Sequence, residues 1–354
     1  MKVGIVTFHR AVNYGAVLQT YALQQTLQKM QIENDVIDYR SKCIEKLYCI
    51  WKPLLSNLRT LQIYPRTLKK IRFGKFINKH IIMSRSISSS QELKELNMQY
   101  DFFITGSDQV WCEKCARSDQ TYFLNFADPR KKRSYAASIG KDTLSESMEK
   151  EYKKLLYDYN VVSVREQSAA QIVKKIEDDI VTYVNIDPTL LLDDSEWKKI
   201  AVVPPIKTKY ILMYTVLGQY YLFDFARKLS KKTGLPIIYL NEEMMHKYNE
   251  FKYKTAVSPE EFVGYFLNAE YVVTNSFHGT AFSIINHKNF FVEIDAVGRK
   301  NTRAEELLAK LGIKGREIKD IKDNYDAEIE WEKIEEKLER ERKKSKEYLE
   351  SVLR

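Results

Sequence analysis

The sequence predicts an α/β protein made of two Rossmann-like halves, and three observations lead to this class. Short apolar segments of strand length alternate with amphipathic helical segments along the chain. The alternation occurs in two series, separated by residues 193–209, which contain two adjacent prolines and are typical of a connector. Polar loops follow the strands directly, as in parallel sheets, whose ligands lie beyond the carboxyl ends of the strands.

The first series opens with a β-loop-α-β unit. Residues 2–8 form an apolar strand, residues 9–14 a polar loop, and residues 15–30 a helix whose apolar positions mostly share one face. A second strand follows at residues 34–38. Beyond residue 90 the series continues with strands at 101–104, 133–137, 161–164 and 181–184 and a helix at 166–175.

A basic segment at residues 41–90 interrupts this alternation. It contains eleven Lys and Arg against one acid, Glu45, and so accounts for the net charge of +9 of the whole chain. Residues 54–79 read as one or two helices broken near Pro65, and the small polar residues 84–90 end the segment. A solvated helical insertion is the simplest interpretation. The alternatives are a surface for a phosphate-bearing substrate or for an anionic membrane, whereas nucleic acid is disfavoured because no binding motif accompanies the charge.

The second series repeats the pattern of the first. Strands are predicted at 210–216, 235–240, 271–274 and 289–294, with helices at 220–232, from Ser258 onward and after Gly279. We therefore expect an N-terminal Rossmann-like domain at 1–195 with a basic helical insertion at about 41–90, a C-terminal Rossmann-like domain at 196–325, and a charged helix at 326–354 that lies back across the first domain.

The composition excludes several classes of protein. Of the 354 residues, 44% are hydrophobic and 30% charged, as in ordinary globular domains. No apolar run reaches the roughly 18–20 residues of a membrane span, and the first residues do not resemble a signal peptide, so we expect a cytoplasmic protein. Four cysteines make no disulfide framework, and the single CxxC of Cys112 and Cys115 supplies too few ligands for structural zinc. The patterns HExxH, GxSxG, GxGxxG and the P-loop are absent, so we expect neither a metal nor a dinucleotide.

The sharpest local pattern is Asn275-Ser276-Phe277-His278-Gly279-Thr280. Here a strand runs into a polar loop that holds one of five histidines, and a helix begins near Gly279. The N-terminus of a helix suits a phosphate or carboxylate, and histidine can transfer a proton near neutral pH. The alternative is a histidine that merely caps the helix.

Five other loops at strand ends carry candidate residues. Asn13 and Gly15 begin a helix, where a backbone without a bulky side chain allows a ligand to approach closely. Asp108 follows another strand and can orient a sugar hydroxyl, or it can simply be turn chemistry. Arginine at a strand end, as at Arg165, can clamp a carboxylate or phosphate, or form a salt bridge with Glu166 or another neighbour. The remaining candidates are Ser138, Arg299 and Arg303.

Six segments together resemble the polysaccharide pyruvyl transferase family. They are NYGAVLQTYALQ (13–24), YDFFITGSDQVW (100–111), SYAASIG (134–140), SVRE (163–166), IDPTLLL (186–192) and NSFHGTAFSI (275–284). They occur in the order of the family, and the resemblance covers about residues 1–312. It implies a GT-B-like architecture of two Rossmann-like domains that face a cleft.

The resemblance also implies a reaction. Phosphoenolpyruvate donates its three-carbon unit to two hydroxyls of one sugar, which forms a cyclic ketal and releases phosphate, and no cofactor is required. The acceptor is a saccharide destined for a cell-surface polymer such as an exopolysaccharide. Where that acceptor is lipid-linked, the basic segment is expected to contact the inner face of an anionic membrane.

The resemblance assigns roles to the candidate residues. His278 is the acid/base or phosphate-facing group, and Asp108 is the second catalytic candidate. Arg165 holds the carboxylate or phosphate of the donor, and Arg303 shares that task. Relatives often carry an arginine where this chain has Ser276, so one expected cation is missing. The other substrate-binding candidates are Asn13, Gly15, Ser138, Asn275, Ser276 and Gly279.

Two other functions fit the same pattern. A GT-B glycosyltransferase that uses a nucleotide sugar has the same two halves, but it needs a pocket for the base and ribose, often with an acid on the ribose. A saccharide-binding protein on a transferase fold needs no catalytic histidine, since fold does not imply function.

Overall fold

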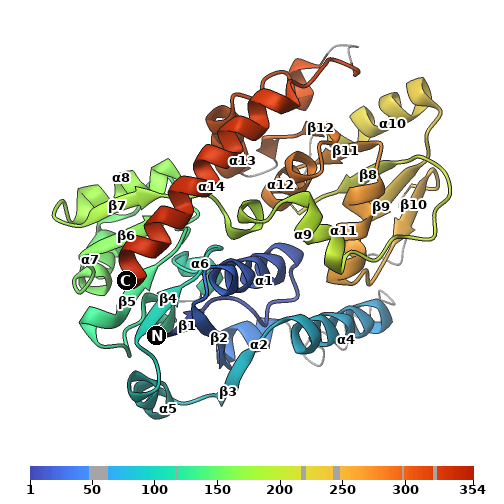
Figure 1. Ribbon diagram of the computed structural model, residues 1–354. Helices are drawn as coiled ribbons and strands as arrows, with labels where there is room; N and C mark the ends of the chain where they lie inside the picture. The colour runs from blue at the N-terminus through green and yellow to red at the C-terminus, as the bar shows by residue number, and fades with distance from the viewer. Residues whose placement is uncertain (48–62, 117–118, 217–220, 242–247, 297–298, 322–324) are drawn as a thin grey trace. The chain divides into compact units, whose positions relative to one another are not determined.

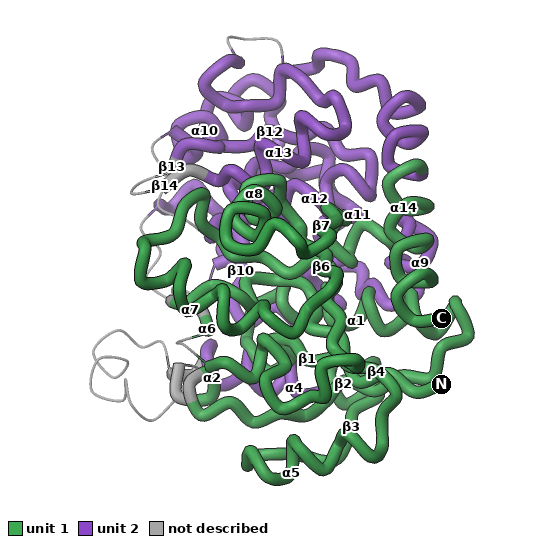
Figure 2. Tube along the Cα trace, turned by 90° about the vertical axis from the view of Figure 1, so that its left-hand side faces the viewer, with its two compact units in different colours: residues 1–49, 77–191, 340–354 green, residues 50–76, 192–339 purple. Residues whose placement is uncertain are grey.

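The computed structural model describes residues 1–47, 63–116, 119–216, 221–241, 248–296, 299–321 and 325–354 (Figure 1). The chain divides into two compact units, which Figure 2 distinguishes by colour. Unit 1 comprises residues 1–49, 77–191 and 340–354, and unit 2 comprises residues 50–76 and 192–339. Two helices, α4 (Ile63–His80) and α14 (Trp331–Leu353), have residues in both units.

Unit 1 contains a parallel five-stranded sheet in the order β3-β2-β1-β4-β5. Its strands are β1 (Lys2–Val6), β2 (Glu33–Tyr39), β3 (Met83–Ile87), β4 (Phe102–Thr105) and β5 (Lys132–Ser134). The parallel pair β6 (Val161–Val164) and β7 (Val181–Val184) adjoins it through a bridge between Ala137 and Val164. The helices are α1 (Tyr14–Lys29), α2 (Lys42–Leu47), α5 (Ser90–Glu95), α6 (Glu113–Ala116), α7 (Glu146–Leu156) and α8 (Gln167–Ile176).

Unit 2 contains a second parallel sheet in the order β10-β9-β8-β11-β12. Its strands are β8 (Ile211–Tyr214), β9 (Ile237–Leu240), β10 (Phe251–Lys254), β11 (Tyr271–Thr274) and β12 (Asn289–Val292), and a short antiparallel pair, β13 (Asp295–Ala296) and β14 (Arg299–Lys300), follows. The helices are α9 (Asp194–Ile200), α10 (Leu222–Thr233), α11 (Pro259–Asn268), α12 (Phe277–Ile285) and α13 (Thr302–Leu311).

Both sheets therefore have the same strand order, with the first strand in the middle. In each sheet the order reverses beside that strand, between β1 and β4 in unit 1 and between β8 and β11 in unit 2. Ligands of open parallel sheets bind at such a reversal, beyond the carboxyl ends of the strands. The loops after these four strands are therefore the first place to look for a site.

The cores explain why the strands read as apolar runs. Val3, Ile5, Phe103 and Ile104 of the first sheet are fully buried, as are the four residues of β8 to within a few per cent. A strand covered on both faces must be apolar at every position rather than at alternate ones. The sequence pattern is thus a direct consequence of helices covering both faces of each sheet.

The basic segment differs from the predicted insertion. Residues 83–87 form β3, the edge strand of the first sheet, and residues 50–76 group with unit 2 rather than forming an insertion in the first domain. Pro65 lies in the first turn of α4, where a missing N–H costs nothing. The predicted helical residues 54–62 lie outside the described residues.

Other predicted boundaries shift for local reasons. The expected connector at 193–209 begins with α9, whose N-cap Asp193 accepts a hydrogen bond from the backbone N–H of Glu196. The division between the units falls after Leu191. The C-terminal helix, expected from residue 327, begins at Trp331, and its last turns pack on unit 1, where Tyr348 donates to Ser134 O at 2.9 Å. None of the helices in the described part of the chain is both long and apolar enough to cross a membrane.

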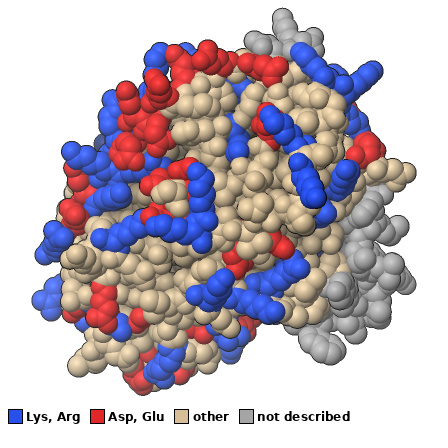
Figure 3. All heavy atoms as spheres, turned by 45° about the vertical axis from the view of Figure 1, so that its right-hand side comes forward, with Lys and Arg blue, Asp and Glu red and all other residues tan. Residues whose placement is uncertain are grey.

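Charge on the surface is mixed rather than one-sided. On the face in Figure 3, Lys and Arg are interspersed with Asp and Glu. In α4, Arg66, Lys70, Lys75 and Lys79 are exposed, whereas Arg72 pairs with Glu261 at 2.6 Å. The predicted contact of this basic helix with an anionic membrane stays a prediction.

Candidate active site

The loop after β1 leads into the N-terminus of α1. Asn13 is the exposed N-cap, and its Oδ1 accepts a hydrogen bond from the backbone N–H of Ala16 at 3.2 Å. Gly15 is buried in the first turn, which carries no acidic side chain. The positive end of this helix thus lies at the carboxyl edge of the first sheet, a suitable place for an anionic or hydroxylated ligand.

The loop after β4 holds Asp108 in an unusual backbone conformation. Its φ is +79°, in the left-handed region that residues other than glycine seldom adopt. The conformation is maintained because Asp108 O accepts hydrogen bonds from the backbone N–H groups of Val110 at 2.8 Å and Ser138 at 3.0 Å. Such strain often accompanies functional sites, and here it fixes where a partly exposed carboxylate leaves the sheet edge.

Arg165 follows β6 directly and lies in a buried ionic cluster. Its Nη1 donates to Asp187 Oδ2 at 2.6 Å, and its Nε is 3.6 Å from Glu166 Oε2. Burial alone would lower the pKa of Arg165, but the carboxylates of Asp187 and Glu166 outweigh it and raise that pKa. The salt-bridge alternative for Arg165 is therefore realised, and the guanidinium is held in one orientation.

The surrounding side chains fix this cluster from both sides. Ser107 Oγ donates to Asp187 Oδ2 at 3.1 Å, and Thr189 donates its hydroxyl to Asp187 Oδ1 at 2.7 Å. The hydroxyl of Ser138, a predicted substrate-binding residue, donates to Glu166 Oε1 at 2.6 Å and is fully buried. The hydroxyl of Ser138 thus holds Glu166, and its backbone N–H holds Asp108 in the neighbouring loop.

A second ionic cluster lies near β1, and its residues are not among the predicted site residues. His9 Nε2 lies 3.1 Å from Asp38 Oδ1, and its Nδ1 lies 3.1 Å from Thr7 O. Arg10 donates to both carboxylate oxygens of Asp38, at 2.8 and 2.7 Å. Burial would raise the pKa of Asp38, but the hydrogen bonds from His9 and Arg10 outweigh it, so that pKa lies below its usual range. The cluster anchors the loop that leads to Asn13.

In unit 2 the predicted histidine lies in the first turn of α12 rather than in a loop. Ser276 is the N-cap, and its Oγ accepts a hydrogen bond from Gly279 N at 3.3 Å. His278, the second residue of the helix, is mostly buried, and its ring meets that of Phe277 edge-on with centroids 5.1 Å apart. Ser276, where the resemblance led us to expect an arginine, therefore caps the helix.

Asn275 connects this helix to its neighbours. Its Oδ1 accepts from Val216 N, in the loop after β8, at 2.9 Å, and its backbone O accepts from Asn301 Nδ2 at 2.9 Å. Asn301 is the N-cap of α13, so this bond places the first turn of α13, with Arg303, beside the start of α12. The side chain of Arg299 lies outside the described residues.

Gly279 is required because α12 starts close to β11. A Cβ at this position would lie 2.3 Å from Thr274 Oγ1, which already donates to Tyr214 O at 2.6 Å and accepts from Ser276 N at 3.1 Å. We expect Gly279→Ala to lower the free energy of unfolding by about 1–3 kcal/mol, as overpacking does, and to displace His278. Urea denaturation measures the loss, with Gly74→Ala in α4 as a control, since a Cβ there meets nothing within 4 Å. Equal stability of the two variants would contradict the close contact.

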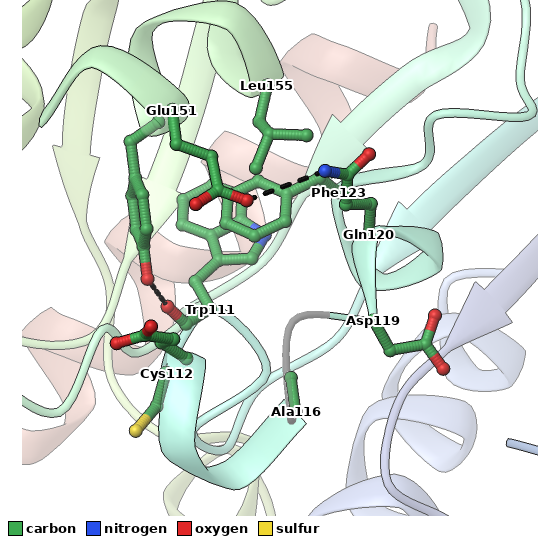
Figure 4. Close-up of a pocket in the computed structure, with 10 residues that line it drawn as sticks. Trp111, Cys112, Ala116, Asp119, Gln120, Phe123, Glu151 and Leu155 are labelled. Carbon is green, nitrogen blue, oxygen red and sulfur yellow. Dashed lines mark hydrogen bonds between the residues drawn. The ribbon is translucent and has the colours of Figure 1, made fainter. Parts of the chain in front are cut away.

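The small pocket beside α6 is a separate feature (Figure 4). Trp111, Cys112, Phe123 and Leu155 line it, and its volume is about 20 Å³. That volume holds about one water molecule, so it cannot hold a substrate. Trp111 itself is buried and stacks on Phe123 with ring centroids 5.3 Å apart, which makes it a core residue.

The structure thus gathers the predicted residues into one group at the carboxyl edge of each sheet. In unit 1, Asp108, Ser138 and Arg165 belong to connected loops, while Asn13 and Gly15 begin α1. In unit 2, Asn275, Ser276, His278 and Gly279 form one turn, which Asn301 joins to the helix of Arg303. Asp187 and Asp38 complete the two ionic clusters, and no local pattern in the sequence predicts their pairing.

Two parallel sheets of identical strand order, each with polar residues at its carboxyl edge, define a GT-B fold, and solved structures agree. UDP-GlcNAc 2-epimerase from Methanocaldococcus jannaschii superposes with a TM-score of 0.52 at 10% identity, covering 96% of this chain and 92% of that one. UDP-GlcNAc 2-epimerase from Neisseria meningitidis bound to UDP-GlcNAc gives 0.51 at 13% identity, covering 100% and 99%. At such identities the similarity shows the fold alone, and it confirms the predicted fold class.

The sequence places the chain more narrowly. The family model for polysaccharide pyruvyl transferase matches residues 13–292, and the chain belongs to that family. The match confirms the resemblance and indicates a transferase of polysaccharide biosynthesis. It spans His278 and Arg165 but ends before Arg303. A search of curated proteins found no significant match to the sequence.

Proposed function

We propose that this protein transfers pyruvate from phosphoenolpyruvate to a sugar of a cell-surface saccharide, as a cyclic ketal. The observation that carries the proposal is the position of His278. His278, within the segment that the family model matches, lies in the first turn of a helix whose start is free of acidic side chains. A helix start favours negative charge, and an imidazole there can exchange a proton with a bound anion.

The donor requires groups that recognise a carboxylate and a phosphate. Arg165 is a buried, preoriented guanidinium, and a guanidinium can bond two anions at once because it carries five N–H donors. We assign it to the carboxylate or phosphate of the donor. Arg303, in the first turn of α13, shares that task.

The chemistry proceeds through a cationic carbon. Protonation of C3 of phosphoenolpyruvate turns the methylene into a methyl group and leaves C2 electron-deficient. A sugar hydroxyl loses its proton and bonds to C2. The C2–O bond to phosphate then breaks, phosphate leaves with both bonding electrons, and a second hydroxyl of the same sugar bonds to C2 and loses its proton. The products are the ketal and inorganic phosphate.

Two side chains are assigned to the proton transfers. His278 supplies or accepts the proton next to the phosphate, since its ring lies at the helix start. Asp108, whose carboxylate is partly exposed at the edge of the first sheet, accepts a proton from an attacking hydroxyl. Asn13 and Gly15 at the start of α1 line the same edge of unit 1 and hold the saccharide.

Isotope labelling tests the proposed bond changes. Both ketal oxygens come from the sugar, so ¹⁸O placed in the bridging position of phosphoenolpyruvate must appear in the released phosphate. In D₂O the ketal methyl group must contain one deuterium. Mass spectrometry of the phosphate and of the product, across a panel of saccharide acceptors, measures both labels. Retention of ¹⁸O in the saccharide product would refute the proposed cleavage of the bond between C2 and the bridging oxygen.

The glycosyltransferase alternative meets an obstacle in unit 2. Glu293, after β12, is the buried acid at the carboxyl edge of the described part of the second sheet, and it is the candidate for a ribose partner. Its Oε1 accepts a hydrogen bond from the backbone N–H of Tyr221 at 2.6 Å, so one of its carboxylate oxygens holds the start of α10. Thermal stabilisation by phosphoenolpyruvate, and none by a nucleoside diphosphate, would favour the pyruvyl transferase.

A further inference from the structure

Unit 2 contains a pocket at the end of its sheet that is opposite to His278. It has a volume of about 460 Å³ and lies at the amino ends of β11 and β12, where Glu270, Lys288 and Asn289 line it. His278 follows the carboxyl end of β11, and four strand residues separate the two ends by about 13 Å. The pocket is therefore distinct from the candidate active site, and its volume is within the range of ligand pockets.

The wall of this pocket is an aromatic pair. The rings of His287 and Trp331 stack with centroids 4.8 Å apart and planes 18° from parallel. His287 Nε2 also lies 3.2 Å from Glu335 Oε2, which holds the imidazole in the stack. The pair thus presents stacked aromatic rings among polar residues.

His287 occupies a backbone position that usually belongs to glycine. It follows the end of α12 with φ +48°, and the N–H groups of His287 and Lys288 bond back to Ile284 O and Ser283 O. This is the Schellman turn, in which glycine avoids the strain of the left-handed conformation. A histidine there carries strain that a glycine would avoid, and its side chain builds the pocket wall.

Two of the carboxylates around the wall have partners within unit 2. Asp326 Oδ1 accepts from Tyr271 Oη at 2.5 Å, and burial together with this bond raises the pKa of Tyr271 to about 12. Glu270 pairs with Lys209 at 3.0 Å. Burial lowers the pKa of Lys288, which also lines the pocket.

The charge of the lining selects the kind of ligand. Three carboxylates, those of Glu270, Asp326 and Glu328, face one lysine and one histidine, so a phosphate or another polyanion is disfavoured. Fixed oxygen acceptors beside a flat aromatic wall suit a neutral ligand with many hydroxyls and an apolar C–H face. We propose that this pocket binds a sugar unit of the saccharide acceptor other than the unit that receives pyruvate. The choice of a saccharide rests on the proposed function.

Binding of neutral oligosaccharides tests this proposal without any turnover. The probes are tetrasaccharides of glucose, galactose and N-acetylglucosamine, measured with the full chain by saturation-transfer NMR and calorimetry. We expect at least one to bind, Trp331→Ala to weaken it about tenfold or more, and Trp331→Phe to retain most of the affinity. His287→Gly places the favoured residue in the turn and so preserves folding, but it removes half of the wall and must also weaken binding.

The remaining arms separate this site from the active site. His278→Ala must leave the oligosaccharide affinity unchanged, and inorganic phosphate must not displace the sugar. The proposal is overturned if no tetrasaccharide binds, if Trp331→Ala binds as the unaltered chain does, or if phosphate competes. Binding that depends on Trp331, in a protein that releases no phosphate from phosphoenolpyruvate, would sustain this site while refuting the proposed function.

Discussion

Replacing His278 by alanine is expected to lower the rate of phosphate release from phosphoenolpyruvate by about 100- to 10,000-fold, the usual contribution of a general acid or base. Release is measured with a saccharide acceptor identified from the panel. The side chain is mostly buried at the start of α12, but the helix is capped by Ser276, whose bond to Gly279 does not involve the imidazole. Folding should therefore survive the substitution, and circular dichroism checks that it does.

The same variant distinguishes the two roles that remain open for His278. If the imidazole transfers the proton, kcat falls while the Kd of phosphoenolpyruvate changes little. If it binds the phosphate, Kd rises and the pH profile of kcat keeps its shape. His278→Gln, which can donate a hydrogen bond but cannot act as an acid near neutral pH, should restore binding only in the second case.

His80→Ala is the matched control. His80 is also a partly buried histidine beside an aromatic ring, with its centroid 6.0 Å from that of Tyr21, but it lies at the end of α4. It should leave turnover near that of the unaltered chain. Equal turnover of His278→Ala and His80→Ala would refute a catalytic His278 and favour a saccharide-binding protein on a transferase fold.

Three strands and one helix start were predicted at the positions that the structure has. The strands at 161–164, 181–184 and 271–274 were predicted with the bounds that β6, β7 and β11 have. In the last of these the apolar run ends where the polar loop begins, so the pattern itself marks the boundary. Ser258 and Pro259 likewise predicted the start of α11, and the capping box with Glu261 is present.

Two edge strands, β3 and β10, were missed because their composition is that of a loop. β3 reads MSRSI and has two exposed residues, and β10 reads FKYK and has lysine at every second position. An edge strand is covered by fewer neighbours, so its sequence need not be apolar, and polar or charged residues there discourage pairing with other chains. Only the strand order of the assembled sheet identifies these segments.

The sequence predicted which residues lie at the site, but not which side chains contact one another there. Polar residues after strands could be found one by one, because a parallel sheet puts such loops at one edge. Their partners could not, since Asp38 is 29 residues from His9, and Asp187 is 22 residues from Arg165. A pairing between distant loops is decided by the packing of the sheet, and no spacing in the sequence encodes it.

Arg165 illustrates how such a contact changes the interpretation of a residue. The position of Arg165 after a strand predicts either a clamp for an anion or a salt bridge. The structure shows the salt bridge with Asp187. The proposed function needs both the salt bridge and the clamp, because Asp187 orients the guanidinium to which the donor binds. Asp187 is then a positioning residue, and the stability of the protein should depend on it strongly.

Removing Asp187 is accordingly expected to cause the largest loss of stability among the ion pairs discussed here. Arg165 and Asp187 have side-chain exposures of 2% and 0%, so Asp187→Ala leaves a cation in the interior without its main counter-charge. Breaking one partner of a buried pair costs about 3–5 kcal/mol, and the bonds from Ser107 and Thr189 are lost as well. The free energy of unfolding in urea measures the loss.

The exposed pair Lys198–Asp194 provides the control. Its Nζ–Oδ2 distance is 2.5 Å, almost the same as the 2.6 Å of Arg165–Asp187, but its side chains are 58% and 45% exposed. Asp194→Ala should therefore cost about 1 kcal/mol or less. Replacing Arg165 and Asp187 together by leucine should cost less than the sum of the two single replacements, because neither charge is then left alone. Additive losses, or a loss in Asp187→Ala no larger than in Asp194→Ala, would show that the guanidinium does not depend on Asp187.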